Sequence, residues 1–425
     1  MRHIFILLMG CVWIASTAAA DVLSWEDCVQ EASQGNPDLR AAQENLRSSE
    51  FLAHAAISGY FPQITASLSA SREHVSGLPE PSLASTSWGA SSTSYSASIT
   101  GSQNLFSGFQ DWAKWRQAEA NAQASQANLD TVKAKVSYDL KSAYAGLLYA
   151  QNSLELAKNI IQRREENYNL VELRFQSGNE NKGSLLLSKA YLNDAKLSAL
   201  QAEGAIRVAQ SQLAKVLGRD SYDDLRVVGA VPISLPPKDP VIVELVKRTP
   251  DHRKAVAFER SAEESVTLSR SSFLPSLSLV GSIGRQGDTF FPNNDYWSVG
   301  VTLSYPLFSG GRDYYSTKSA LEVLAAASSS RASVDNEVRT QLTQALTGFI
   351  EAVERLKVDK SYLEAATARE EIGRSKHNNG LLSFDNWDII ENDLIAKQKS
   401  VLQSTRDRIV SEASWEQALG TGAIQ

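Results

Sequence analysis

The chain has 425 residues, of which 43% are hydrophobic and 21% charged, and its formal net charge is -6. This acidic balance provides no basic surface for a nucleic acid and excludes that class of partner. Only 12 prolines and 2 methionines occur. Long tracts of Ala, Ser, Gln, Leu and Asn favour long helices with closely packed seams over an ordinary globular core.

The first twenty residues have the pattern of an export signal. A short basic start precedes the apolar residues 4–14, and residues 18–20 are three alanines. We therefore expect residues 1–20 to be a signal peptide cleaved after Ala20. Two alternatives are an uncleaved anchor helix and a lipoprotein signal with Cys11 acylated. Cleavage leaves Cys28 as the single thiol, which excludes an intrachain disulfide.

The rest of the chain contains an internal duplication. Residues 36–38 (Asn-Pro-Asp) match residues 249–251 (Thr-Pro-Asp), and the tetrapeptide LFSG at 105–108 recurs at 307–310. The first match has a shift of 213 positions and the second a shift of 202, which places a length difference of 11 residues in a loop between them.

The domain organisation follows from this duplication. We expect a first structural repeat over 21–218, a linker over 219–240 that contains four prolines, a second repeat over 241–420, and a tail over 421–425. Each repeat begins with a helix and continues with two Ser-rich segments, the LFSG element, a very long helix and a return helix.

The Ser-rich segments alternate strictly between apolar and hydroxyl side chains. In residues 63–72, for example, Ile64, Ala66 and Leu68 alternate with Ser and Thr. Period two indicates strands with one apolar and one polar face. We predict strands at about 63–73, 93–105, 275–285 and 295–306, each long enough to cross a bilayer when tilted.

Aromatic residues gather near the ends of these predicted strands, where rings are favoured at a membrane–water interface. The interface candidates are Tyr60, Phe61, Phe106, Phe273, Trp297, Tyr305 and Phe308. Each LFSG element is expected to end a strand hairpin, with its glycine allowing the chain to turn from strand into helix. No later apolar run reaches 18 residues, so a membrane-spanning part would consist of strands.

Long helices are predicted over 109–177 and 311–379, because neither 69-residue stretch contains proline. A continuous helix of that length spans about 100 Å. Apolar residues recur every seventh position, from Leu140 to Phe175 and from Leu342 to Leu363, which indicates coiled-coil packing. Gly178 and Gly380 end these helices, and return helices follow over 184–217 and 383–419, so that two helical hairpins form.

Four strands cannot close a barrel, and an open edge in lipid would leave backbone groups unpaired. The barrel must therefore be shared between copies. Eight strands leave an interior filled by side chains, whereas the Ser and Thr faces require water, which favours three or more copies. The predicted fold class is α+β: helical hairpins forming a coiled-coil tunnel, with four strands per chain in a shared barrel, internally duplicated.

In the order of these features the chain resembles the outer membrane efflux protein family, the TolC-like channels. The features are residues 25–28, the 36–39 helix start, the Phe-Pro at 61–62, both LFSG elements, both glycine-marked turns and both Leu-Gly endings. The resemblance implies a homotrimer with a twelve-stranded barrel in the outer-membrane lipid and a tunnel through the periplasm. It also implies a periplasmic adaptor protein, an inner-membrane pump of the RND or ABC type, and a role in efflux or type I secretion.

The resemblance also implies candidate site residues. Asp385 and Asp388 have the spacing of acidic residues that narrow the inner end of such tunnels, and six carboxylates in a trimer would attract cations. A helix N-terminal turn is the other interpretation. Glu180 is a weaker gate candidate. The expected adaptor contacts at the hairpin ends are Arg174, Gly178, Lys376, His377 and Gly380.

The sequence indicates no enzyme. The mature histidines have no ligand spacing, and we find no motif for a catalytic site, a metal site or a cofactor. Two rival functions remain at this level. One is an exported coiled-coil interaction protein without a barrel, and the other is a non-conducting outer-membrane assembly or adhesion protein.

Overall fold

The structure is a computed structural model that describes residues 22–75, 90–221 and 224–424. The expected signal peptide and the lipidation alternative at Cys11 lie outside the described residues. The described chain forms two compact units. Unit 2 consists of Ala42–Asp130 and Val246–Arg339, and unit 1 contains the remainder, so the two longest helices contribute to both.

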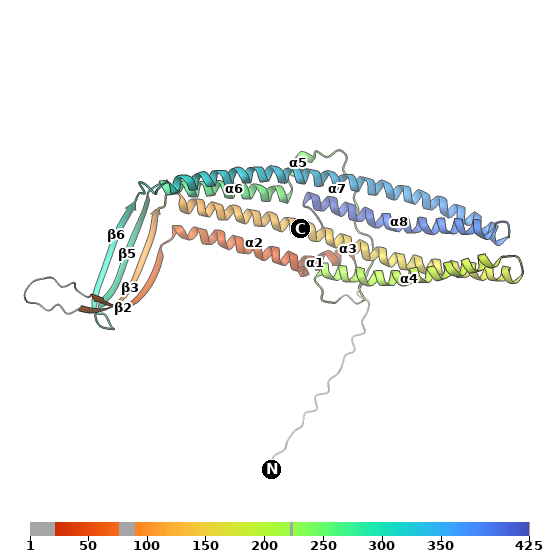
Figure 1. Ribbon diagram of the computed structural model, residues 1–425, viewed down its shortest axis with the longest axis horizontal. Coiled ribbons are helices and arrows are strands. Elements are labelled where there is room, and N and C mark those ends of the chain that lie inside the picture. Colours follow the sequence, from red (N-terminus) through yellow and green to blue (C-terminus); the bar gives the residue numbers. More distant parts are fainter. Residues whose placement is uncertain (1–21, 76–89, 222–223, 425) are drawn as a thin grey trace, which may run out of the picture. The chain divides into compact units, whose positions relative to one another are not determined.

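Helices account for most of the described chain, and their lengths repeat between the two halves (Figure 1). Both longest helices have 67 residues, and both return helices have 36. The α-helices are α1 (Trp25–Gly35), α2 (Pro37–Ala56), α3 (Gln110–Gln176), α4 (Lys182–Leu217), α5 (Ile242–Val246), α6 (Pro250–Arg270), α7 (Arg312–Asn378) and α8 (Phe384–Leu419).

The helix starts follow from local sequence. Ser24 caps α1 and exchanges hydrogen bonds with Asp27 in a capping box. Asn36 and Thr249, which begin the duplicated motif, each accept a hydrogen bond from a backbone N–H three residues later. The proline that follows each of them is the first residue of α2 or α6, where its missing N–H has no partner to lose.

Unit 1 contains α4, α8 and the parts of α3 and α7 that pack with them, residues 131–176 and 340–378, and these two hairpins run side by side (Figure 1). Its core lies on the predicted seven-residue seam, where Leu140, Leu147, Leu342 and Phe349 are fully buried. Alanines such as Ala150 are buried between these larger side chains and allow the helices to approach closely.

The proline-rich linker is held against α3 in unit 1. It includes a two-residue strand that the sequence did not predict, β4 (Arg226–Val227), parallel to β1 (Val22–Leu23). The side-chain amide of Gln151 hydrogen-bonds both the N–H and the C=O of Val227, and the Tyr144 hydroxyl donates to the Val228 carbonyl. Side chains of α3 thus satisfy linker backbone groups that no helix or sheet would otherwise pair.

Unit 2 carries a four-stranded antiparallel sheet in the order β2-β3-β5-β6. The strands are β2 (Gln63–Val75), β3 (Ala90–Phe106), β5 (Ser276–Gly287) and β6 (Asn294–Ser304). They overlap the predicted ranges, although β3 begins three residues earlier, β2 and β5 end two residues later, and β6 ends two residues earlier than predicted. Pro306 follows closely and cannot donate to a strand ladder.

The register aligns the side chains into rows across all four strands. One row reads Ala66, Ile99, Ile283 and Trp297. The adjacent row, whose side chains point to the opposite face, reads Ser67, Ser98, Gly284 and Tyr296. One face is therefore apolar and exposed, and the other carries hydroxyls that pair across strands, as Ser69 does with Ser96 and Ser282 with Ser298, each at 2.8 Å.

Both LFSG elements turn strand into helix in the same way. Gly108 has φ 62°, and Gly310 has φ 66°, so each glycine adopts the left-handed backbone conformation that its position requires. The next residue is also left-handed in both copies, but it is Phe109 in the first and Gly311 in the second. Among the described residues, no helix is long and apolar enough to cross a membrane.

Candidate functional site

The two hairpin ends have the same backbone geometry. Gly178 has φ 76° and Gly380 has φ 75°, and in each turn the N–H of the following residue bonds a carbonyl five residues earlier, at 2.8 Å. Asn181 caps α4 by accepting from the Ser184 N–H at 2.9 Å, whereas Ser383 makes no side-chain cap for α8.

The expected adaptor contacts divide into exposed and buried residues. Gly178, Lys376 and Gly380 are exposed, but His377 is only 1% exposed. Arg174 reaches across from the first hairpin and donates to the His377 carbonyl at 2.6 Å. His377 therefore joins the two hairpin ends within the chain and presents no surface to a partner, which differs from the sequence expectation.

The hydrogen bonds of His377 define its neutral tautomer. Nδ1 lies 3.1 Å from the Leu382 carbonyl, which accepts only, so Nδ1 carries the proton. Nε2 lies 3.3 Å from a guanidinium N–H of Arg174, which donates only. The ring stacks on Trp387 with centroids 5.5 Å apart. Burial, followed by the Arg174 charge, lowers the pKa of His377 below its ordinary value of 6.5, against the opposing effect of the Leu382 carbonyl and Glu180.

The two predicted gate aspartates occupy different environments. Asp385 is exposed in the first turn of α8, but Asp388 is buried. Asp388 Oδ1 lies 3.3 Å from Arg164, and Asp388 Oδ2 accepts from the Tyr191 hydroxyl at 2.8 Å. Within one chain, Asp385 and Asp388 therefore do not point together to an exposed surface. Glu180, the third candidate, accepts hydrogen bonds from Asn181 in its own turn.

Arg164 is the centre of a buried cluster that the sequence reasoning missed. Its guanidinium donates to Glu391 at 2.7 Å and to Asn392 at 2.5 Å, and it lies over the Tyr191 ring at 4.7 Å. Burial raises the pKa of Glu391, with Arg164 and Arg163 opposing that shift. A signal was present: Arg164 continues the buried series Val136, Ala143, Ala150 and Ala157, where a charge requires a partner.

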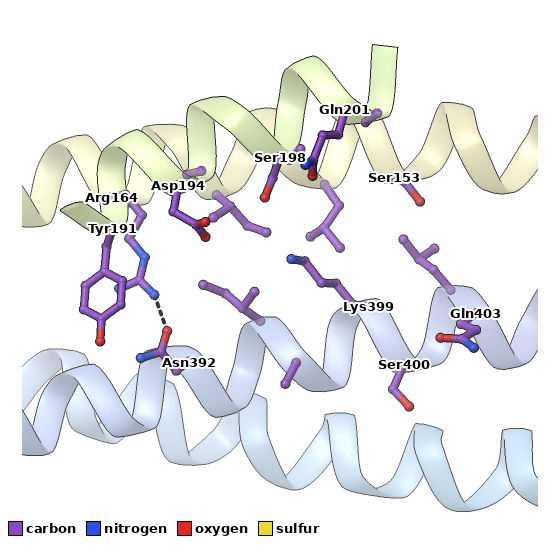
Figure 2. A pocket seen from close by; sticks show the side chains of 18 of the residues that line it. Ser153, Arg164, Tyr191, Asp194, Ser198, Gln201, Asn392, Lys399, Ser400 and Gln403 are labelled. Atoms are coloured by element: carbon purple, nitrogen blue, oxygen red, sulfur yellow. Dashed lines mark hydrogen bonds between the residues drawn. The ribbon is translucent and has the colours of Figure 1, made fainter. Parts of the chain in front are cut away.

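A cavity of about 660 Å³ opens beside this cluster between α3, α4 and α8 (Figure 2). Arg164 and Tyr191 lie at one end, and Lys399 and Asp194 project into the space from opposite sides (Figure 2). Its wall also mixes hydroxyl and amide groups with apolar side chains. Because charges of both signs line it, the cavity favours no single ligand charge.

The predicted interface aromatics are all exposed, and six of the seven lie on the helix side of the sheet. Tyr60 and Phe273 end short 3-10 helices just before β2 and β5, and Phe106 is the last residue of β3. Trp297 is the exception, since it lies near the start of β6, in one row with Ala66, Ile99 and Ile283. The remaining members, Phe61, Tyr305 and Phe308, flank the strands on the helix side.

Comparison with known proteins decides the family. The sequence model described as outer membrane efflux protein matches residues 28–219 and 241–421, which is most of both repeats. The chain belongs to the outer membrane efflux protein family. Family membership places the protein in the outer membrane, extending into the periplasm, and the family is one of channel proteins.

Individual relatives are distant. Over 304 residues the chain is 26% identical to the fusaric acid resistance protein FusA of Burkholderia cepacia, covering 67% of this chain and 55% of that protein. It is 26% identical over 242 residues to the alkaline protease secretion protein AprF of Pseudomonas aeruginosa, covering 55% and 50%. The matched segments thus span about half the length of these two relatives.

Solved structures show the fold. The outer-membrane channel OprN superposes with a TM-score of 0.81 at 22% identity, covering 94% of this chain and 91% of OprN. The outer membrane protein VceC of Vibrio cholerae gives 0.80 at 20%, covering 94% and 97%. The predicted fold class, with helical hairpins and four strands for a shared barrel, is confirmed.

Proposed function

We propose that this protein is the exit duct of a tripartite efflux or type I secretion system. Three copies form a twelve-stranded barrel in the outer membrane, and their hairpins form a tunnel in the periplasm. The tunnel passes small molecules or proteins delivered by an inner-membrane pump of the RND or ABC type through a periplasmic adaptor.

The observation that carries this proposal is the pairing of the sheet. Among the described strands, β2 and β6 each pair on one side only, and they run in opposite directions. The open edge of β6 therefore fits the open edge of β2 in a second copy as an antiparallel neighbour. Since an unpaired edge in lipid is costly, closure requires further copies.

The polar face of the sheet favours three or more copies over two. Ser67, Ser98 and Thr100 lie on the side that closure turns inward, and rows of such hydroxyls require water. Eight strands leave no room for a water column, whereas twelve do. The first rival function, a coiled-coil protein without a barrel, is not compatible with this sheet. The second, a non-conducting outer-membrane protein, is distinguished from a duct by measuring conductance.

Reconstitution tests the duct directly. Purified protein in detergent should have the mass of three chains by light scattering, and it should insert into planar bilayers with discrete single-channel currents. A stable trimer that conducts no ions would support the assembly or adhesion alternative. A monomer in detergent would contradict both the shared barrel and the duct.

Of the two aspartates that the sequence suggested for the gate, we propose only Asp385. The exposed Asp385 supplies one carboxylate per copy, and thus three in the trimer, to the inner end of the tunnel. Asp388 is held by Arg164 and Tyr191 inside its own chain. We expect Asp385→Asn to lower cation selectivity in single-channel recordings more than Asp388→Asn does. Equal effects of the two substitutions would show that Asp385 and Asp388 both belong to the carboxylate ring of the gate.

The adaptor surface is likewise reduced to the exposed residues of the hairpin ends. Gly178 and Gly380 mark equivalent turns, and Lys376 is exposed beside the second. Crosslinking from Cys at Lys376 to the adaptor in the periplasm, with Cys at the buried Ser188 as the matched control, would test this placement.

A further inference from the structure

The apolar face of the sheet carries a trough of about 710 Å³ between two neighbouring rows of side chains. The first row is Ala66, Ile99, Ile283 and Trp297. The second row is Leu68, Ala97, Arg285 and Asp295, one step farther from the helices. Both rows line the trough, and the backbone of the row between them forms its floor.

Small side chains create this hollow. Ala66 and Ala97 stand diagonally opposite one another in the two rows, and their methyl groups leave the space above the sheet open. Trp297 and Leu68, which are 77% and 87% exposed, rise at its two edges. An apolar depression of this volume on a lipid-facing surface accommodates a hydrocarbon chain.

One end of the trough is charged although the surrounding face is apolar. Arg285 Nε donates to Asp295 Oδ1 at 2.6 Å, and the two side chains are 64% and 74% exposed. The bond uses one of the five N–H groups of the guanidinium. Charges on the lipid face of a barrel are costly at the bilayer centre and nearly neutral at its interface, so this pair marks the level of the headgroups.

Aromatic rings follow beyond the charges on the same face. Tyr95 is two residues past Ala97 on β3, and its ring meets Phe290 edge-on with centroids 5.7 Å apart. Phe290 in turn contacts Phe291 at 5.1 Å, and these two rings are 72% and 83% exposed. Together they form an open aromatic surface above Arg285, at the end of the sheet far from the helices.

We propose that this trough binds a phosphorylated glycolipid of the outer leaflet. The inference rests on the proposed barrel, which turns the apolar face toward lipid. Moving away from the helices, the face presents an apolar trough, then a guanidinium, then aromatic rings. That order matches an acyl chain, a phosphate and a sugar. Arginine donates to phosphate in a charge-assisted geometry, and aromatic faces pack against the C–H faces of sugar rings.

Asp295 tunes this site because it competes with the phosphate for Arg285. A phosphate oxygen has to share the guanidinium with a carboxylate 2.6 Å away, and the nearby negative charge weakens its binding. Loss of Arg285 and loss of Asp295 should thus act in opposite directions, an outcome that general disruption of the sheet would not produce.

The test is native mass spectrometry of the detergent-solubilised trimer with three added lipids. These are an acylated diglucosamine phosphate, its dephosphorylated form, and phosphatidylglycerol, which has phosphate without an amino sugar. Wild type should retain the first most strongly. Arg285→Gln should weaken its retention by about tenfold or more, and Asp295→Asn should strengthen it by about threefold.

Two control variants change charge elsewhere in unit 2. Arg312→Gln removes an exposed arginine that is also paired with an aspartate, at the start of α7. Glu73→Gln removes a carboxylate from the hydroxyl face of β2, opposite Ser92. Both controls should leave glycolipid retention unchanged. Trp297→Ala, which removes one edge of the trough, should weaken all three lipids together.

Equal retention of the phosphorylated and dephosphorylated glycolipids would overturn the proposal, and so would equal retention of phosphatidylglycerol. Unchanged retention in Arg285→Gln would do the same. Each sample is also tested for trimer mass and single-channel conductance. A conducting trimer without lipid preference contradicts the glycolipid site alone, whereas the absence of a trimer contradicts the duct.

Discussion

The two repeats have closely similar helical backbones, but they differ in the charged residues that they bury. Their long helices, return helices and glycine turns agree in length and in φ. In both buried clusters that join the hairpins, however, α3 of the first repeat supplies the cation and α8 of the second supplies the carboxylates. Arg164 meets Asp388 and Glu391, and Lys141 meets Glu412 and Glu416.

The residues at the equivalent positions, 202 residues apart, show that this arrangement is one-sided. Ala366 and Thr343 stand where Arg164 and Lys141 do, and the four carboxylates correspond to Leu186, Lys189, Gln210 and Ala214. The interface between α3 and α8 inside one chain is ionic, and the corresponding residues of α7 and α4 cannot form the same contacts. The duplicated fold therefore has an ionic α3–α8 interface whose charges the second copy of the motif does not repeat.

Removal of Arg164 should have the largest effect on this comparison. Arg164→Leu leaves Asp388 and Glu391 buried without their cation, and breaking a buried pair on one side costs about 3–5 kcal/mol. We expect the hairpin ends of unit 1 to lose protection in hydrogen exchange and the denaturation midpoint to fall.

The matched control for Arg164 is Arg369→Leu. Arg369 is also an arginine facing a carboxylate of α8, but it is 58% exposed and 3.9 Å from Asp393. Its loss should change stability by no more than about 1 kcal/mol. A cost for Arg164→Leu as small as that of the control would show that the buried cluster does not hold the hairpins together.

Removal of Lys141 should have a smaller effect than removal of Arg164. Lys141→Met strands Glu412 and Glu416, but Glu412 keeps hydrogen bonds from the Ser234 N–H and hydroxyl, and Arg408 lies 3.7 Å away. We expect a loss of about 2 kcal/mol in the free energy of unfolding, measured by urea titration. A cost equal to that of Arg164→Leu would mean that Ser234 and Arg408 provide no compensation.

The sequence predicted the elements well because their periods are long and uninterrupted. Sixty-nine residues without proline and strict Ser alternation leave few alternatives for residues 109–177 or for the strands. It also predicted which strand face is apolar. The β1–β4 pair escaped prediction because two-residue strands carry no period, and their partners are far apart in sequence.

The candidate site was predicted less completely, for a physical reason. Spacing places Asp385 and Asp388 on one side of a helix but does not show what packs against that side. The partners of Asp388 come from α3 and α4, roughly 200 residues earlier. Burial of His377 likewise depends on Arg174 and Trp387, which a hairpin-end motif does not reveal.

The repeats also differ at position 377, where the equivalent residue in the first repeat is Phe175. His377 has a pKa lowered below 6.5, mainly by burial, so the unfolded chain binds its proton first as the pH falls. The contribution of the neutral ring is thus complete above about pH 6.5 and is lost as the pH falls toward the lowered folded pKa. Protonated Nε2 also loses its bond from Arg174, at about 1 kcal/mol.

His377→Phe, which makes the second repeat like the first, tests this difference. The denaturation midpoint of wild type minus that of the variant should decline between pH 7 and pH 5, because titration of all other groups is common to both. The variant retains the apolar stacking partner for Trp387. A difference that does not change with pH would show that His377 is not the titrating group at the hairpin end.

The smallest effect should show where the repeats remain equivalent. A Cβ added at Gly178 or at Gly380 meets no atom within 4 Å, so the only cost of alanine there is the left-handed backbone. Gly178→Ala and Gly380→Ala should each lower the free energy of unfolding by about 1 kcal/mol and should agree to within about half of that. Urea titration of the two variants side by side measures the difference.

Unequal costs would mean that strain in one turn is coupled to the Arg174–His377 contact, since that contact involves only the second turn's backbone carbonyl. Repeating the pair in the Arg174→Leu background would then restore equality, because both turns would be held by their own helices alone.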